Sequence, residues 1–190
     1  MKSHRRLNSA TRAALLGAAL AATALPALSY ADATSTAGIW QKHEYLFEFI
    51  GFTSTYSCDG LAGKLEVLLK VSGARKDAKA RAGVCTSGVG RPDKFSQAHL
   101  VFYTLAPADG PIAAPAVAAV WQPVVLAEHR PQQVESGDCE LVDQFQRSVL
   151  PMFTTRNVEN HTTCVPHQIS GSAIALKFES FVEMPSPQAR

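Results

Sequence analysis

Hydrophobic and polar residues alternate along residues 43–52 (HEYLFEFIGF), which is the pattern of a strand with one buried face. Aromatic side chains share one face of this segment, and glutamates share the other. Alternation returns over 77–85, where apolar residues up to Val84 are expected to face inward, and over 98–105. Between the first two strands, apolar residues recur three and four positions apart, as on one side of a helix: Leu61, Leu65, Leu68 and Leu69. The pattern therefore predicts strand, helix, strand and strand.

The second half of the chain gives the same order of elements. Residues 117–129 are rich in valine and predict a strand, and 154–164 and 171–182 predict two more. A helical stripe lies between the first two of these strands and consists of Val142, Phe145 and Val149. Both halves are thus expected to form a β-α-β-β unit.

Residues with capping chemistry mark the expected helix ends. Ser57 precedes the first helix and Asp138 precedes the second, and both side chains can accept hydrogen bonds from free backbone N–H groups. Gly73 follows the first helix and is a typical residue for a helix C-terminus. We therefore expect Ser57 and Asp138 to act as equivalent N-caps.

The spacing of rare residues indicates an internal repeat. Trp40 stands 18 residues before Cys58, and Trp121 stands 18 residues before Cys139. These are the only two tryptophans of the chain, and each is followed by glutamine. The offset between the two sets is 81 positions, although few other residues are identical at this offset. A single α+β domain with coincidental spacing is the alternative interpretation.

The repeat suggests how the chain is divided. We expect a signal peptide over 1–33, a first unit over 34–105, a Pro/Ala-rich connector over 106–116, a second unit over 117–184, and a disordered tail over 185–190. The predicted fold is α+β: two tandem β-α-β-β pseudo-repeats share one core, and two helices pack on a mixed sheet.

The four cysteines fit this layout as two disulfides. A helix that connects two strands running in the same direction begins near the end of the second strand. This predicts pairing of Cys58 with Cys85 and of Cys139 with Cys164, although four cysteines allow two other pairings. Cys58 and Cys139 lie at helix starts, where redox cysteines also occur. No Cys-x-x-Cys motif is present, and structural disulfides are favoured over a thiol redox protein.

The first residues resemble an export signal in composition. A short apolar stretch follows four basic residues, and small residues offer cleavage sites between 29 and 33. Cleavage after Ala31 removes four of the 18 basic residues and none of the 16 acidic ones, which leaves a net charge of −2. This balance gives no support to nucleic-acid binding. We expect a periplasmic or secreted protein with no stable membrane span after cleavage.

Histidines and glutamates near the first strand of each unit suggest a metal site between the units. The candidates are His43, Glu44, Glu48, Glu128 and His129. A pseudo-twofold axis would bring the two strands together, but outward-facing polar residues are the favoured interpretation. His161, Cys164 and His167 also have ligand-like spacing, which a disulfide at Cys164 would disable.

Two further groups suggest binding. A basic cluster surrounds the turn between the first helix and the next strand and could meet an anionic partner, such as a lipid headgroup or an acidic glycan: Arg75, Lys76, Lys79 and Arg81. A solvated strand edge is favoured over this possibility. Trp40 and Trp121 could form a paired aromatic site, but packing in the core is favoured for both.

No nucleophile elbow, phosphate loop or dinucleotide fingerprint is present, and no cofactor is indicated. We therefore expect an exported, disulfide-stabilised module that binds an unknown protein or an anionic envelope ligand, without catalysis. The alternatives are a metal-dependent enzyme that uses the histidines and glutamates above, and a thiol redox protein.

Overall fold

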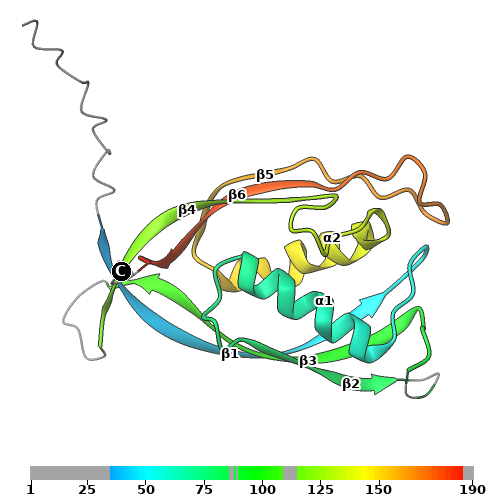
Figure 1. Cartoon of the computed structure of the whole chain (residues 1–190), viewed down its shortest axis with the longest axis horizontal. Coiled ribbons are helices and arrows are strands. Elements are labelled where there is room, and N and C mark those ends of the chain that lie inside the picture. Colours follow the sequence, from blue (N-terminus) through cyan, green and yellow to red (C-terminus); the bar gives the residue numbers. More distant parts are fainter. Residues whose placement is uncertain (1–34, 86–87, 89, 109–114, 186–190) are drawn as a thin grey trace, which may run out of the picture. The chain divides into compact units, whose positions relative to one another are not determined.

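The computed structural model describes residues 35–85, 88, 90–108 and 115–185. The expected signal peptide 1–33, most of the connector (109–114) and the tail from 186 lie outside this part. Six strands and two α-helices are described (Figure 1): β1 (Thr36–Ile50), α1 (Cys58–Val71), β2 (Lys79–Cys85), β3 (Phe95–Pro107), β4 (Val117–Ala127), α2 (Cys139–Ser148), β5 (Thr155–Asn160) and β6 (Ala175–Glu183). Short 3-10 turns, η1 (Ser136–Asp138) and η2 (Leu150–Met152), flank α2.

The six strands form one sheet in the order β2-β3-β1-β4-β6-β5, and every pair of neighbours is antiparallel. The expectation of a mixed sheet is therefore wrong. β1 and β2 do run in the same direction, but β3 lies between them and pairs with both. β6 separates β4 from β5 in the same way.

The two halves of the sheet are joined only at one end. Residues Thr36–Gly38 of β1 pair with Val117–Ala119 of β4, whereas β1 and β3 pair along thirteen residues, from Gly38 to Ile50. Beyond this junction the halves diverge, and α1 and α2 lie between them (Figure 1). The junction therefore acts as the closed end of a V whose interior is filled by the helices.

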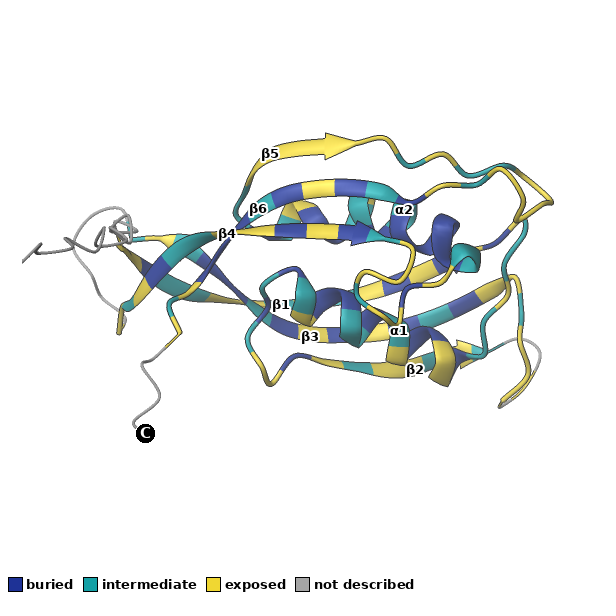
Figure 2. Ribbon diagram, turned by 45° about the horizontal axis from the view of Figure 1, so that its top comes forward, coloured by how far each residue is buried: buried dark blue, intermediate teal, exposed yellow. Residues whose placement is uncertain are grey.

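One core connects both helices to both halves of the sheet. Alternate residues of each inner strand are buried, as Figure 2 shows, and they meet the helix stripes that the sequence predicted. The largest fully buried side chains include Phe47, Phe102, Leu65, Leu126 and Phe145. Val84 is an exception to the predicted alternation, because a bulge between Ala82 and Cys85 turns it outward and leaves it 69% exposed.

The ends of α1 follow the predicted capping chemistry. The Ser57 hydroxyl accepts a hydrogen bond of 3.1 Å from the Gly60 N–H. Gly73 has a φ of 102°, and a Cβ at this position would lie 2.5 Å from Val182 Cγ1. Glycine at this position therefore lets the chain turn closely past the end of β6.

The start of α2 differs from the prediction. The Asp138 side chain makes no capping hydrogen bond to α2. It accepts instead from the Glu135 N–H at 2.8 Å, from the Tyr56 hydroxyl and from Lys64 Nζ. The equivalence of Ser57 and Asp138 as N-caps is wrong, because the Asp138 carboxylate is occupied by groups from outside α2.

Both predicted disulfides are present. Cys58 is linked to Cys85 with a Cα–Cα distance of 6.1 Å, and Cys139 is linked to Cys164 with a distance of 5.6 Å. The first disulfide joins the start of α1 to the last residue of β2, and the second joins the start of α2 to the segment after β5. The same-direction argument holds even though β3 and β6 separate the strands concerned.

Candidate anion-binding cleft

The turn after α1 holds charged residues near the junction of the two halves of the sheet. Backbone hydrogen bonds from Ser72 to Leu68 and from Ala74 to Leu69 close the helix. The Arg75 N–H then donates to the Tyr103 carbonyl oxygen of β3 at 2.9 Å. The turn is thus fixed to the sheet, and it presents Arg75 and Lys76 beside the first residues of β1.

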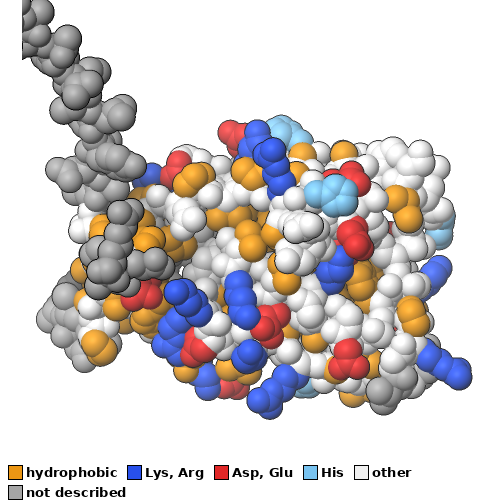
Figure 3. Space-filling view, in the orientation of Figure 1, with side chains coloured by type: hydrophobic (Ala, Val, Ile, Leu, Met, Phe, Trp, Pro, Cys, Tyr) orange, Lys and Arg blue, Asp and Glu red, His pale blue; other side chains and the backbone are white. Residues whose placement is uncertain are grey.

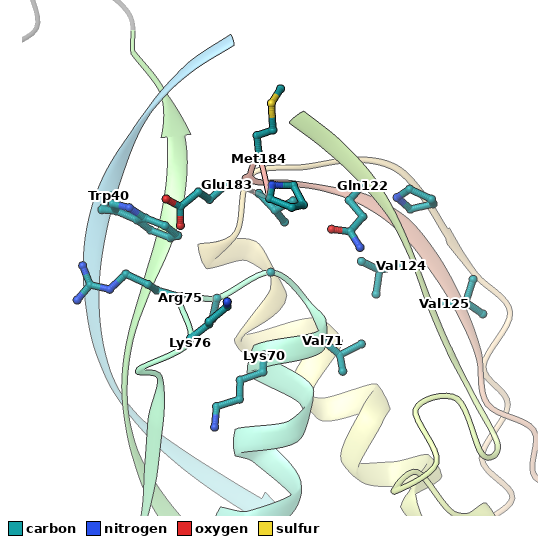
Figure 4. A pocket seen from close by; sticks show the side chains of 15 residues that line it. Trp40, Lys70, Val71, Arg75, Lys76, Gln122, Val124, Val125, Glu183 and Met184 are labelled. Atoms are coloured by element: carbon teal, nitrogen blue, oxygen red, sulfur yellow. The ribbon is translucent and has the colours of Figure 1, made fainter. Parts of the chain in front are cut away.

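A cleft of about 620 Å³ lies between this turn and the other half of the sheet. Its walls are the end of α1, Trp40 of β1, the middle of β4 and the end of β6 (Figure 4). The polar side chains that line it are Lys70, Arg75, Lys76, Gln122 and Glu183. Apolar contacts come from Trp40, Val124 and Met184, among others. The cleft therefore combines an aromatic wall with charges of both signs.

The charges of the cleft differ in how far they are already neutralised. Lys70 Nζ lies 2.6 Å from a Glu66 carboxylate oxygen, and the hydrogen bond from Lys70 lowers the pKa of Glu66. Arg75 binds both oxygens of Asp77, at 2.7 and 2.8 Å. Within the described part of the chain, Lys76 and Glu183 have no ion-pair partner. These two side chains are therefore the ones available to a ligand.

Arg75 is held against aromatic rings on the outer side of the cleft. Its guanidinium lies 3.7 Å from the centroid of the Tyr103 ring and 5.7 Å from that of Trp40. The bond to Asp77 raises the Arg75 pKa above its ordinary value. Arg75 thus fixes the Trp40 wall rather than offering a free cation.

The basic cluster predicted from the sequence is divided between two surfaces. Arg75 and Lys76 line the cleft, whereas Lys79 and Arg81 lie on the outer face of β2, in a separate groove of about 600 Å³. In the view of Figure 3, Lys and Arg side chains gather around the C-terminal end of α1. Lys79 Nζ is 3.6 Å from Glu66 of α1.

The tryptophans pack at the junction of the two halves. Both are partly buried against a small apolar cluster of Leu105, Ala119 and Phe181. Trp121 lies 5.2 Å from the Phe181 ring, and Arg156 covers it with its guanidinium 4.3 Å from the ring centroid. Arg75 and Arg156 are 81 positions apart, as are Trp40 and Trp121. Both tryptophans therefore pack as favoured, and Trp40 also lines the cleft.

The histidines and glutamates considered as metal ligands are not brought together. β1 and β4 pair only at their first residues, so the later parts of the two strands diverge. His43 faces inward, where its Nε2 lies 2.8 Å from Thr104 Oγ1 and burial lowers its pKa. Among the described residues, no group of three or more His, Cys, Asp or Glu side chains is arranged to hold a metal ion.

The other candidates have separate surroundings. Glu44 forms an ion pair of 2.5 Å with Lys42, and Glu48 accepts a hydrogen bond from Gln97. His129 Nε2 lies 3.7 Å from a carboxylate oxygen of Glu128, in the turn after β4. Near the second disulfide, Cys164 is bonded to Cys139, the backbone N–H of His161 donates to Ala175, and the ring of His167 packs edge-on to Phe52.

Sequence reasoning missed a polar network between the two helix starts. The Glu140 carboxylate accepts hydrogen bonds from the backbone N–H groups of Phe52, Thr53 and Ser54, at 3.1 to 3.2 Å. Next to it, Asp138 binds Lys64 and Tyr56. The acidic residues on both sides of Cys139 were a signal for this network, but their partners lie more than 70 positions away.

Comparison of the chain with protein-family models, curated proteins and solved structures gave no match. No helix in the described residues is both long enough and apolar enough to cross a membrane. The chain therefore has to be interpreted from its own geometry.

Proposed function

We propose that this protein is an exported, disulfide-stabilised binding module that takes an anionic envelope ligand into the cleft between α1 and the β4–β6 half of the sheet. The observation that carries the proposal is the position of Lys76, a cation without an ion-pair partner in the described residues, in the same cleft as the Trp40 ring. An anion bound there would give Lys76 a counter-charge.

The chemistry of the cleft favours an acidic glycan as the ligand. The face of Trp40 offers an apolar surface to a sugar ring, and Lys76 offers donors to a carboxylate. Gln122 and Glu183 offer acceptors to hydroxyl groups. A ligand with both an acid group and several hydroxyl groups would satisfy all these side chains together.

We also propose that two related units, 34–105 and 117–184, build the sheet. Three features support this duplication. The strand order is the same when read inward from either edge, the two disulfides occupy corresponding positions, and the Arg–Trp pairs recur at the same offset. The duplication explains why the cleft lies beside the junction, where the two units meet.

Titration with a galacturonic acid trisaccharide tests the binding proposal, with a neutral glucose trisaccharide as the control ligand. Tryptophan fluorescence and calorimetry should show saturable binding of the acidic sugar only. Lys76→Gln should raise its Kd about tenfold, because one charge-assisted contact is lost. Lys94→Gln removes the same charge from an exposed loop and should leave the Kd unchanged. Equal binding of both sugars, or equal loss in both variants, would contradict the proposal.

A further inference from the structure

The outer face of β1, β3 and β2, on the side opposite the helices, exposes many large apolar side chains. Nine large hydrophobic residues are exposed in the described part of the chain. Five of them lie on this face: Leu46, Ile50, Val84, Phe95 and Val101. In the other half of the sheet, β4–β6–β5, the described strand residues include only two exposed large hydrophobic side chains, Val125 and Val158. The outer face of β1, β3 and β2 is therefore the more apolar surface of the sheet.

The charges on this face are arranged in columns along the strands. The β1 column contains Glu44 and Glu48, and the β2 column contains Lys79 and Arg81. The β3 column between them is apolar and aromatic at Val101 and at several of its other positions. Strand register places Glu44 opposite Val101, and Val101 opposite Lys79. One row across the face thus runs from a carboxylate through an apolar side chain to an ammonium group.

We propose that this outer face binds a second copy of the chain, with a twofold axis that runs along β3. Rotation about such an axis lays β3 on β3 and places β1 of each copy over β2 of the other. Glu44 of one copy then lies over Lys79 of the second copy, and the reverse contact forms by symmetry. Val101 meets its own counterpart on the axis.

The neighbouring rows bring other residues together under the same rotation. Lys42 is level with Tyr103 and lines the same groove as Asp77 of the opposite edge, so Lys42 approaches the Arg75–Asp77 ion pair of the other copy. At the far end, Ile50 pairs in register with Phe95, and both line a common hollow with Val84. Val84 precedes Cys85, which is level with Ser96, so rotation brings Ile50 of one copy beside Val84 of the other, one row along the strand, and removes apolar surface from water.

The charge balance of the face favours a second copy over an anionic lipid surface. The cations Lys42, Lys79 and Arg81 lie beside the carboxylates Glu44 and Glu48, and Asp77 is neutralised by Arg75. A negative surface would repel the β1 column, whereas a twofold-related copy pairs Glu44 with Lys79. Strand spacing and rise give the face a size of about 14 by 30 Å, so we expect a modest interface and a concentration-dependent dimer.

Sedimentation velocity of the purified protein over a concentration series tests the proposal through a charge swap. Lys79→Glu and Glu44→Lys each place like charges together twice per dimer, and each should raise the dimer Kd at least about tenfold. An equimolar mixture of the two variants should recover the dimer, because every Glu–Glu or Lys–Lys contact becomes a Glu–Lys contact. The double variant should recover it as well.

Lys177→Glu, a charge reversal on an exposed position of β6, is the matched control and should dimerise like the unchanged protein. Circular dichroism and thermal melting establish that each variant is folded. A protein that stays monomeric at all concentrations would overturn the proposal. Sedimentation of such a monomer with phosphatidylglycerol vesicles would overturn it as well, because the face would then bind a lipid surface. Dimerisation of the variants equal to that of the unchanged protein would also overturn it, because the contact would then use another face.

Discussion

The Tyr56 hydroxyl donates a hydrogen bond of 2.5 Å to the Asp138 carboxylate and so connects the residues that precede the two helices. Lys64 Nζ approaches the other Asp138 oxygen at 2.7 Å, and Asp138 is only 3% exposed. Burial raises the Tyr56 pKa, and the charge of Asp138 raises it further, so the hydroxyl keeps its proton and remains a donor. This contact and the neighbouring bonds of Glu140 hold the open end of the V together.

Tyr56→Phe should therefore destabilise the protein by about 2 kcal/mol, the usual contribution of a hydrogen bond to a charged group. Asp138 keeps its contacts with Lys64 and with the Glu135 N–H, so folding should not be lost. Urea unfolding followed by circular dichroism measures the change. Tyr45→Phe is the control, because the Tyr45 hydroxyl has no hydrogen bond among the described residues. Equal effects of both variants would show that the Tyr56 hydroxyl contributes nothing specific.

Two glycines, one inside α1 and one just after it, should change stability in opposite directions when replaced by alanine. Gly73→Ala places a side chain at a φ of 102° and within 2.5 Å of Val182, so we expect a loss of about 2 kcal/mol or more. Gly63 lies inside α1, and a Cβ there meets nothing within 4 Å. Gly63→Ala should stabilise the protein by about 0.5–1 kcal/mol. Thermal and urea unfolding give both values, and a neutral Gly73→Ala would contradict the close approach of the turn to β6.

His43 should make stability depend on pH between about 5.5 and 7, around the ordinary histidine pKa of about 6.5. Burial lowers the pKa of His43 in the folded protein. Above the ordinary pKa the ring is neutral in both the folded and the unfolded protein, and no stability is lost. As the pH falls below it, the unfolded chain binds a proton more readily than the folded one, so folding becomes less favourable.

Urea unfolding at pH 7.5 and 5.5 measures this dependence. His43→Gln should reduce the loss of stability on acidification, because the titrating group is gone while an amide donor to Thr104 is retained. His129→Gln changes an exposed histidine in the turn after β4 and should keep the full loss. An unchanged pH dependence in His43→Gln would show that other groups cause it.

The sequence predicted best those features that depend on residues close together in the chain. The stripe Leu61–Leu69 and the Ser57 cap locate α1, and the cysteine positions gave both disulfides because a connecting helix limits where its strands can end. The antiparallel order did not follow from such patterns, because the insertion of β3 between β1 and β2 depends on contacts between distant segments. Thr104 and Leu105 are both buried, which breaks strict alternation, because the two halves cross at this end of β3.

The cleft was only partly predictable for the same reason. The basic cluster was visible around Arg75 and Lys76, since these residues are adjacent in the sequence. Trp40 and Glu183, however, reach the cleft from β1 and β6, the first and last strands along the chain. No local pattern relates residues so far apart.

The proposed export and the two disulfides predict a defined mass for the native protein. Purified from outside the cytoplasm without reductant or chelator, the chain should begin between residues 30 and 34 and be four hydrogens lighter than its reduced form, two for each disulfide. Intact mass spectrometry measures both quantities. An intact N-terminus would contradict the signal peptide. Free thiols would favour the redox alternative, and a bound metal ion would favour the metal-dependent enzyme.

The second disulfide should contribute measurably to stability. Cys139 and Cys164 close a loop of 25 residues, and a cross-link of this span stabilises a fold by about 3–3.5 kcal/mol in the chain-entropy estimate. Replacing both cysteines by serine should therefore lower the urea midpoint of unfolding. The double variant avoids a single unpaired thiol that could form wrong disulfides. The matched comparison is the unchanged protein unfolded in reductant, which also breaks Cys58–Cys85 and should lose more. A double variant as stable as the unchanged protein would mean that packing around α2 alone holds this end of the fold.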